Sequence, residues 1–283
     1  MPELPEVETT VRGLKKTIRG LVIKDVWTDL NTKDKRQRDH VANVQYFKIF
    51  RKEILGGKVL SIERRAKNIL INISGGKTIL VHLKMTGYLF CGENPKIKFA
   101  HVIFTLSNKK YLILSDMRKF GKITLLNTKT AHETKHLNNL GPEPLEKQFT
   151  INNFKSRILQ KPNGKIKTIL MNQSILAGIG NIYSDEILWR AGVHPERKVS
   201  SIKEKELKLI FQALKETLRK GINFGGDSTS DYRNIHGLPG KFQLHHGAYR
   251  RTGEKCRKKN CKGIIKRKVI AGRSAHFCDL HQL

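Results

Sequence analysis

Two helical segments in the C-terminal half of the chain are joined by Leu176-Ala-Gly-Ile-Gly-Asn-Ile-Tyr183. The glycines permit a tight turn, and Asn181 is suited to cap a helix that runs to about Arg190. Backbone N–H groups exposed at such a helix start can hold a phosphate. Taken alone, the stretch also fits an ordinary corner between two helices. Whether it binds a phosphate therefore has to be judged from the rest of the sequence.

Downstream of this turn, apolar residues recur at helical spacing as far as Gly221. They predict a helix of about 17 residues, and they are Leu207, Ile210, Phe211, Leu214 and Leu218. Residues 224–240 are rich in glycine and poor in apolar side chains, which predicts a long loop. Long loops in compact domains are commonly functional.

The N-terminal half begins with a helical pattern and continues as a β-rich region. Val7, Val11, Leu14 and Ile18 predict a helix from about residue 3 to 19. From residue 55 to about 126, short apolar or alternating runs are typical of strands. The polar residues 128–148 then predict a linker.

The charge of the chain points to a polyanionic partner. The 283 residues include 55 Lys and Arg against 24 Asp and Glu, a formal net charge of +31. Basic residues also cluster in residues 250–283, where Glu254 and Asp279 are the acidic residues. A nucleic acid fits best, because neutralised phosphates release condensed counterions. The alternative is a solvated basic surface without a partner.

Membrane insertion and secretion are not expected. The sequence has no run of about 18 apolar residues that would span a membrane. The start, Met-Pro-Glu-Leu-Pro-Glu, lacks the basic and apolar regions of a signal peptide. No basic amphipathic helix carries the apolar face that binds membrane surfaces. We therefore expect a cytoplasmic protein.

A metal site is predicted near the C-terminus by Cys256-x4-Cys261-x16-Cys278-x2-His281. Zinc takes four tetrahedral nitrogen or sulfur ligands, and close pairs can bind one ion from one turn. The insert carries Ile264-Ile265 and Val269-Ile270, which suit two short strands. His276 competes with His281 as the fourth ligand. The alternative to a metal site is that these three cysteines are free thiols in a basic tail. A disulfide framework is not expected, because a chain of this length has only four cysteines.

Seven short motifs occur in the order that one known family has. They are Met1-Pro-Glu-Leu-Pro-Glu-Val-Glu8, Arg64-Arg-Ala-Lys67, His82-Leu-Lys-Met85, Asp116-Met-Arg-Lys-Phe-Gly121, Leu140-Gly-Pro-Glu-Pro144, Leu176-Ala-Gly-Ile-Gly-Asn181 and Gly272-Arg-Ser-Ala-His-Phe-Cys278. With them the chain resembles, over essentially its whole length, the formamidopyrimidine-DNA glycosylase family. These are bacterial repair enzymes that act on oxidised purines.

The resemblance implies an α+β fold with an N-terminal helix and a β-sandwich. The implied parts are a catalytic domain at 1–130, a linker at 131–150, a helix-two-turn-helix domain with a lesion-side loop at 151–241, and a zinc-finger β-hairpin at 242–283. The family acts as a monomer on double-stranded DNA that contains oxidised bases. The resemblance thus implies one zinc per chain.

Pro2 is the nucleophile that the resemblance implies. Proline in second position permits removal of Met1 and leaves a secondary amine. An α-amino group has a pKa of about 8, against about 10.4 for lysine, so more of it is unprotonated at neutral pH. In the implied reaction, the amine of Pro2 attacks sugar C1′ and the base is expelled. A Schiff base with the opened sugar forms, and β- and δ-elimination follow. Without the resemblance, an inert terminus is the simpler interpretation.

The resemblance assigns three further catalytic residues. Glu3 adjoins Pro2 and does general acid–base work, although its place also suits a helix N-terminus. Lys67 and Arg273 contact phosphates and assist the sugar chemistry, with generic phosphate contact as the alternative. Glu6 supports the site.

Six residues are expected at DNA. Met85, Arg118 and Phe120 match the triad that fills the gap left by an extruded base. Without the resemblance, Met85 and Phe120 would be interpreted as sheet core. The remaining three are expected phosphate contacts, namely Asn181, Lys161 and Lys165.

The chain departs from the family at several positions, and an alternative function remains open. The first cysteine pair is spaced x4, and His281 stands where cysteine is usual. Phe99 replaces a DNA-contacting histidine, and Pro162 falls near a phosphate-binding lysine. Leu4 and the triad favour 8-oxoguanine and formamidopyrimidines as substrates. The alternatives are an endonuclease VIII-like preference for oxidised pyrimidines and a non-catalytic zinc-containing DNA-binding protein.

Overall fold

The computed structural model describes residues 1–32 and 38–283. They form two compact units. The first unit comprises Met1–Asn138 with Phe224–Lys241, and the second comprises Asn139–Asn223 with Phe242–Leu283. The glycine-rich loop after residue 223 therefore packs in the first unit, and not with the helix that precedes it in sequence.

The first unit opens with helix α1 (Leu4–Thr17), close to the predicted bounds. Val7, Val11 and Leu14 are buried, as their helical spacing predicts. Glu3 caps the helix and forms a reciprocal capping box with Glu6, which satisfies backbone donors that the first turn leaves free. The cap thus fixes the two acidic residues nearest the N-terminus.

The strands of the first unit form two antiparallel sheets of four, in the orders β1-β6-β7-β5 and β2-β3-β4-β8. The bounds are β1 (Ile23–Thr28), β2 (Val59–Arg65), β3 (Asn68–Ile73), β4 (Lys77–His82), β5 (Tyr88–Gly92), β6 (Ala100–Leu106), β7 (Tyr111–Ser115) and β8 (Lys122–Asn127). The inner faces share one apolar core. The predicted β-sandwich is confirmed.

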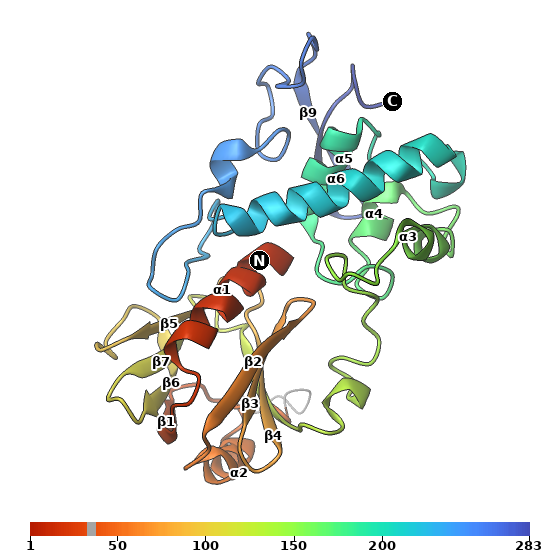
Figure 1. The fold of residues 1–283 in the computed structure, drawn as a ribbon. Coiled ribbons are helices and arrows are strands. Elements are labelled where there is room, and N and C mark those ends of the chain that lie inside the picture. Colours follow the sequence, from red (N-terminus) through yellow and green to blue (C-terminus); the bar gives the residue numbers. More distant parts are fainter. Residues whose placement is uncertain (33–37) are drawn as a thin grey trace. The chain divides into compact units, whose positions relative to one another are not determined.

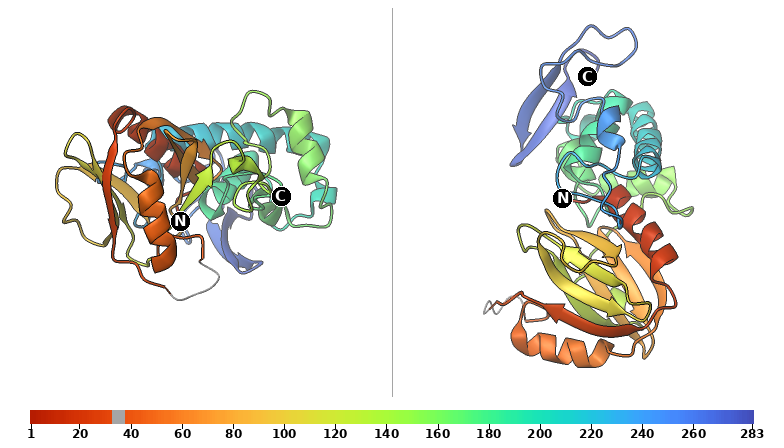
Figure 2. Two further views of the ribbon diagram at one scale, coloured as in Figure 1. Left: turned by 90° about the horizontal axis from the view of Figure 1, so that it is seen from below. Right: turned by 90° about the vertical axis from the view of Figure 1, so that its left-hand side faces the viewer.

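Two helices complete this unit. α1 contacts β2 of one sheet and β5 of the other, while α2 (Val44–Ile54) contacts β1. Phe50 of α2 meets Phe104 of β6 edge to face, with ring centroids 6.4 Å apart. The right-hand view of Figure 2 shows α2 beside the strands of this unit. A short 3-10 turn, η2 (Ala131–Glu133), follows the last strand.

The second unit is helical and ends in a hairpin (Figure 1). Its elements are α3 (Ile151–Ile158), α4 (Ile166–Leu170), α5 (Asn181–Ala191), η3 (Val199–Ser201), α6 (Glu204–Asn223), η4 (Phe242–His245), β9 (Ile265–Ile270) and β10 (Arg273–Cys278). α5 contacts α6, α4 and β10 and is the centre of the unit. The predicted helical domain with a β-hairpin is confirmed.

Two local expectations in the second unit are corrected. Gly180 is the N-cap of α5 in extended backbone, and Asn181 is the first helical residue. Glycine is itself an accepted N-cap residue, so the helix cap lies one residue before the expected Asn. Ile265 and Ile270 lie at the two ends of the same strand, β9, because the reversal comes later, at Ala271 and Gly272, with φ of 46° and 74°.

The loop at residues 224–241 is anchored in the first unit by backbone contacts. The Cys91 N–H donates to the Ile235 carbonyl at 2.7 Å. Ile235 is buried against Gly13 of α1, where a Cβ would lie only 2.8 Å from the isoleucine side chain. Among the described residues, no helix combines the length and the apolar character needed to cross a membrane.

Candidate active site and metal centre

The N-terminal acidic residues lie buried at the start of α1. Pro2 is buried, and Glu3 and Glu6 are 3% and 1% exposed, whereas Met1 is 39% exposed. The Glu3 N–H donates to Glu6 Oε2 at 2.7 Å. Glu6 is therefore bonded to the backbone of the residue that follows Pro2.

Glu6 also holds the glycine-rich loop. The Asp227 N–H donates to Glu6 Oε1 at 2.7 Å, and the Tyr232 hydroxyl donates to the Glu6 carbonyl at 3.1 Å. Gly226 has a φ of 87°, and a Cβ there would lie 3.1 Å from Glu6 Oε1. Only glycine combines this conformation with this approach. One carboxylate therefore fixes both the N-terminus and the expected lesion-side loop, a link that the sequence did not reveal.

Lys67 lies buried at the β2–β3 turn, directly after Ala66, whose φ is 54°. His82 of β4 lies nearby: its pKa is lowered to about 3 by burial and by the charges of Lys84, Lys67 and Lys122. His82 is therefore neutral at neutral pH, and its Nδ1 accepts the Lys84 N–H at 3.0 Å. The lysines make this end of the sheet locally basic.

Two loops of the first unit carry the expected triad. Met85 is 37% and Phe120 49% exposed, so the alternative that both are sheet core is wrong. The Arg118 guanidinium lies 4.5 Å from the Phe120 ring centroid. The Asp116 carboxylate accepts the Gly121 N–H at 2.6 Å and the Thr86 hydroxyl. Asp116 thus ties the Met85 loop to the turn that bears Arg118 and Phe120.

The expected phosphate contacts of the second unit differ in their surroundings. Lys161 and Pro162 are exposed. Lys165 forms an ion pair with Glu196 at 2.7 Å. Asn181 stands at the start of α5, and its Oδ1 is buried with no hydrogen-bond partner among the described residues.

Lys167, which the sequence analysis missed, lies fully buried beside Asn181. Its Nζ contacts the Asp185 carboxylate, the Ser184 hydroxyl at 3.3 Å and the Asn181 carbonyl at 3.5 Å. A charged residue inside the apolar run Ile166-Lys-Thr-Ile-Leu170 was the available signal, because a buried charge requires a partner.

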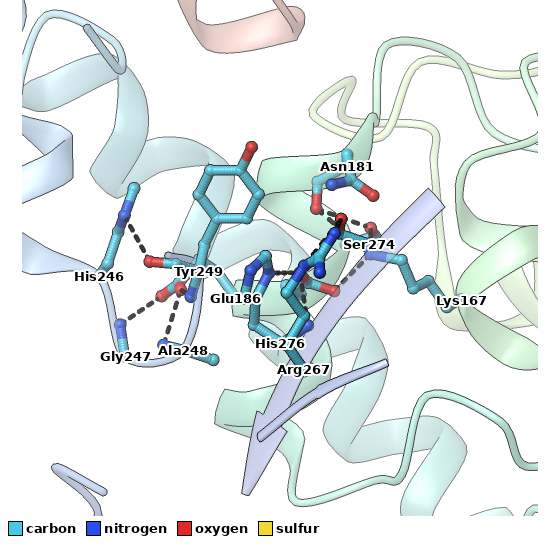
Figure 3. Close-up of polar contacts among 12 residues, drawn as sticks. Lys167, Asn181, Glu186, His246, Gly247, Ala248, Tyr249, Arg267, Ser274 and His276 are labelled. Carbon is cyan, nitrogen blue, oxygen red and sulfur yellow. Dashed lines mark hydrogen bonds and ion pairs between the residues drawn. The ribbon is translucent and has the colours of Figure 1, made fainter. Parts of the chain in front are cut away.

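Asp185 connects α5 to the hairpin, because its carboxylate contacts Lys167 and His276, which are both labelled in Figure 3. Its Oδ2 accepts both the backbone N–H and the ring Nδ1–H of His276 at 2.9 Å. Arg273, three residues earlier at the start of β10, is exposed. The buried bonds at His276 therefore fix the strand that presents Arg273.

Glu186, the neighbour of Asp185, holds the segment that leads to the hairpin. Its carboxylate accepts the backbone N–H groups of Gly247, Ala248 and Tyr249 at 2.7, 2.9 and 2.8 Å. A carboxylate with this many donors is strongly held. The two successive acidic residues of α5 thus fasten two parts of the C-terminal segment.

Four side chains converge in the hairpin as a metal site requires. The ligand atoms of Cys256, Cys261, Cys278 and His281 all lie within 4.8 Å of one another. His281 Nδ1 is 3.4 Å from Cys256 Sγ, and its Nε2 is 2.9 Å from the Trp189 carbonyl. The carbonyl therefore places the proton on Nε2 and leaves Nδ1 as the ligand atom.

One of the sulfur atoms, Cys256 Sγ, accepts hydrogen bonds that favour its thiolate form. Two N–H groups donate to Cys256 Sγ: the Trp189 indole N–H at 3.3 Å and the Lys258 backbone N–H at 3.4 Å. Burial raises the pKa of Cys256, but these donors outweigh burial and lower it overall. His276 is turned to Asp185, so the competition for the fourth position favours His281. The x4 spacing still closes a four-ligand set.

Comparisons with known proteins agree with this geometry. Residues 1–123 match the Formamidopyrimidine-DNA glycosylase N-terminal domain, and residues 140–233 match the Formamidopyrimidine-DNA glycosylase H2TH domain. The chain belongs to the formamidopyrimidine-DNA glycosylase family. It is 38% identical to the Pelotomaculum thermopropionicum enzyme, with 100% of this chain and 99% of the relative covered. It is also 38% identical to the Bacillus subtilis enzyme, with 98% of each covered.

Solved structures of the glycosylase family show the same fold. The Lactococcus lactis Fpg in complex with DNA containing an abasic site has a TM-score of 0.87 at 33% identity, with 99% of each chain covered. The MutM (Fpg) protein of Thermus thermophilus has a TM-score of 0.85 at 34% identity, with 99% of this chain and 98% of the other covered. The expected family and α+β fold are confirmed, and the chain is a DNA glycosylase of base excision repair.

Proposed function

We propose that this glycosylase excises oxidised purines, 8-oxoguanine and formamidopyrimidines, from double-stranded DNA and then cleaves the strand as a lyase. The observation that carries the proposal is that Pro2 lies buried next to Glu3 in the sequence, and that Glu6 Oε2 accepts the Glu3 N–H at 2.7 Å. A fixed carboxyl group beside an amine supplies the acid–base partner that nucleophilic catalysis needs.

The reaction begins once Met1 has been removed. The Pro2 nitrogen attacks sugar C1′, the bond from C1′ to the base breaks, and the base leaves with a proton. Glu3 protonates the sugar ring oxygen as the ring opens, and the nitrogen and C1′ form an iminium. The exposed side chain of Met1, 39% accessible, is consistent with its removal.

The iminium then acidifies the sugar protons. Loss of a C2′ proton breaks the C3′–O bond and releases one phosphate end, which is β-elimination. Loss of a C4′ proton breaks the C5′–O bond and releases the other, which is δ-elimination. Water finally hydrolyses the iminium and restores the amine. Lys67, among the lysines at the end of its sheet, and Arg273, on the hairpin, are proposed to bind the phosphates.

The remaining residues are proposed to bind DNA. Met85 and Phe120 enter the gap left by the extruded base, and Arg118 hydrogen-bonds the orphaned base. Their exposure on two loops tied by Asp116 supports this role. Asn181, Lys161 and Lys165 contact phosphates near the start of α5. We further propose that the protein acts as a monomer on chromosomal DNA in the cytoplasm.

One zinc per chain is proposed to bind Cys256, Cys261, Cys278 and His281. Zinc supplies the cross-link that a segment with so small a core needs in order to hold its fold. The convergence of four ligand atoms within 4.8 Å supports this assignment. The chain's own part is to hold the ligands: the Trp189 carbonyl orients His281, and N–H donors surround the sulfur atoms.

Borohydride trapping on abasic DNA tests the enzyme proposal. The wild-type protein is expected to form a covalent adduct, and Pro2→Gly to lose most of it. Absence of any adduct with wild-type protein would instead indicate the non-catalytic DNA-binding alternative. Excision of 8-oxoguanine and 5-hydroxycytosine in matched duplexes tests the substrate: faster excision of the pyrimidine lesion would favour the endonuclease VIII-like alternative.

A further inference from the structure

A cavity of about 200 Å³ opens in the first unit beside the loops that carry the triad. Its apolar walls are Tyr88 at the start of β5, Phe99 just before β6, and Met117 of the turn after β7. Phe99 and Met117 are 40% and 51% exposed. Pockets for drug-sized ligands measure about 300–1,000 Å³. This cavity therefore suits a group smaller than a drug-sized ligand.

Phe99 occupies the rim in a strained conformation. Its φ is 59°, and a bulky side chain rarely adopts this left-handed region. The Phe99 carbonyl accepts the Asp116 N–H at 3.0 Å, which helps to hold the backbone there. Strained residues persist only where their surroundings enforce them, and they concentrate at binding and catalytic sites. The strained backbone fixes an aromatic ring at the mouth of the cavity.

Charged groups surround the ring. The Lys98 ammonium lies 5.1 Å from the Phe99 ring centroid. Within the described part of the chain, that ammonium has no carboxylate at ion-pair distance. Arg233 and Asp231 also line the cavity, and the Arg233 guanidinium is held by the Ser230 and Tyr232 carbonyls. The cavity thus combines an aromatic wall with cations for a phosphate and an acceptor for an amino group.

The cavity lies directly beside the triad, because the two share the same loops. Thr86 lines the cavity and follows Met85, while Met117 precedes Arg118. The Thr86 hydroxyl donates to Asp116, and the Arg118 N–H donates to Thr86 Oγ1 at 3.1 Å. A duplex that receives Met85 and Arg118 must therefore lie next to the mouth of the cavity.

We propose that this cavity binds one unstacked nucleobase of the bound DNA, with Phe99 as the stacking surface. Every base offers a face to an aromatic ring, so stacking suits any base that leaves the helix near the triad. Asp231 accepts from an exocyclic amino group, and Lys98 is available to the adjoining phosphate. The inference rests on the proposed function in one respect, that the triad enters DNA.

Fluorescence of 2-aminopurine tests this inference directly, since that base carries an amino group. It is placed at successive positions on both strands around a tetrahydrofuran abasic analogue, which the enzyme does not cleave. We expect one position at which the complex of Phe99→Ala emits at least about twofold more strongly than the wild-type complex, because the base has lost its stacking partner. Phe99→Trp should restore the quenching.

Matched variants separate stacking from folding. Phe99→Ala and Phe99→Gly both lack the ring, but glycine accepts the positive φ, so Phe99→Gly should melt at the higher temperature. Both should bind the analogue duplex about tenfold more weakly, which is a typical cost of losing one stacked base. Trp27→Ala, which removes an exposed aromatic from the edge strand β1 of the same sheet, should match wild type.

The inference is overturned if no position distinguishes wild type from both ring-deleted variants, or if their affinities follow melting temperature instead of the ring. Borohydride trapping with wild-type protein is run in parallel. A normal adduct without any position-specific difference refutes the nucleobase cavity alone. A missing adduct refutes the proposed lyase chemistry, while the fluorescence result still decides the cavity.

Discussion

The Asp185 carboxylate accepts both the backbone N–H and the ring N–H of His276, each at 2.9 Å, and also pairs with the buried Lys167. One side chain of α5 thereby joins α4 to the strand that presents Arg273. The hairpin therefore carries two sets of contacts, the four converging side chains of the candidate metal site and this buried carboxylate.

Replacing Asp185 with Asn should be strongly destabilising. The variant leaves Lys167 charged and buried without its counter-ion, and breaking a buried pair in this way costs about 3–5 kcal/mol. Chemical denaturation of the metal-loaded protein measures the change. Glu216→Gln is the matched control, because Glu216 pairs with Arg190 of the same helix as Asp185 in an exposed position. The control should lose no more than about 1 kcal/mol, and equal losses would contradict a special role for Asp185.

Much of this architecture could be predicted from the sequence, because its signals are local. Helical spacing in α1, alternating strands, and paired cysteines each follow from residues close together in the chain. The Asp185–His276 bond joins residues 91 positions apart, and the apolar run around Lys167 shows that this lysine needs a partner without showing that the partner is Asp185. The link from Glu6 to Asp227 is equally non-local. Such contacts depend on packing, so sequence patterns did not reveal them.

The Phe99 position illustrates a second limit. In the sequence, Phe99 stood out only through the resemblance, as a position where the family is expected to have a DNA-contacting histidine. The positive φ, the exposure and the adjoining cavity belong to the folded backbone. Phe99, which in the sequence appeared only as the loss of a DNA contact, thus lies in the folded protein at the rim of a cavity.

Glu196 should give the protein an acid-sensitive contribution to stability. Hydrogen bonds from Lys165 and Lys268 lower its pKa to about 2. A lowered carboxyl pKa stabilises the folded state above the ordinary value near 4.5, and this gain is lost as pH falls from there toward 2. Because the pairs are partly exposed, we expect about 1 kcal/mol.

The measurement compares unfolding free energies of wild type and Glu196→Gln between pH 2 and 7. The difference should be constant above about pH 5 and shrink toward zero near pH 2. A difference that stays constant across the whole range would show that Glu196 acts through something other than its charge.

His82 should remain neutral well below the pH at which histidine ordinarily titrates. Its pKa is lowered to about 3 because burial and the neighbouring lysines oppose a further positive charge. The folded state binds this proton less readily than the unfolded state, so His82 opposes folding as pH falls from about 6.5. NMR of the imidazole should show no titration of His82 between about pH 5 and 8. A midpoint near the ordinary value of 6.5 would be inconsistent with the buried, lysine-surrounded site.

Metal content should depend on His281 and not on His276. We expect His281→Ala to lose zinc, His281→Cys to retain it, and His276→Ala to keep about one ion per chain. The contrast follows because His281 Nδ1 faces the sulfur atoms while His276 bonds Asp185. Elemental analysis of the purified variants decides the matter. Retention by His281→Ala together with loss by His276→Ala would reverse the assignment.

The central claim is that the Pro2 nitrogen bonds to the sugar, and peptide mass spectrometry of the borohydride-reduced complex tests it most directly. The account predicts a protein chain that begins at Pro2 and carries the reduced sugar remnant on its terminal nitrogen. A remnant on any lysine in place of Pro2, or an active chain that still carries Met1, would contradict it.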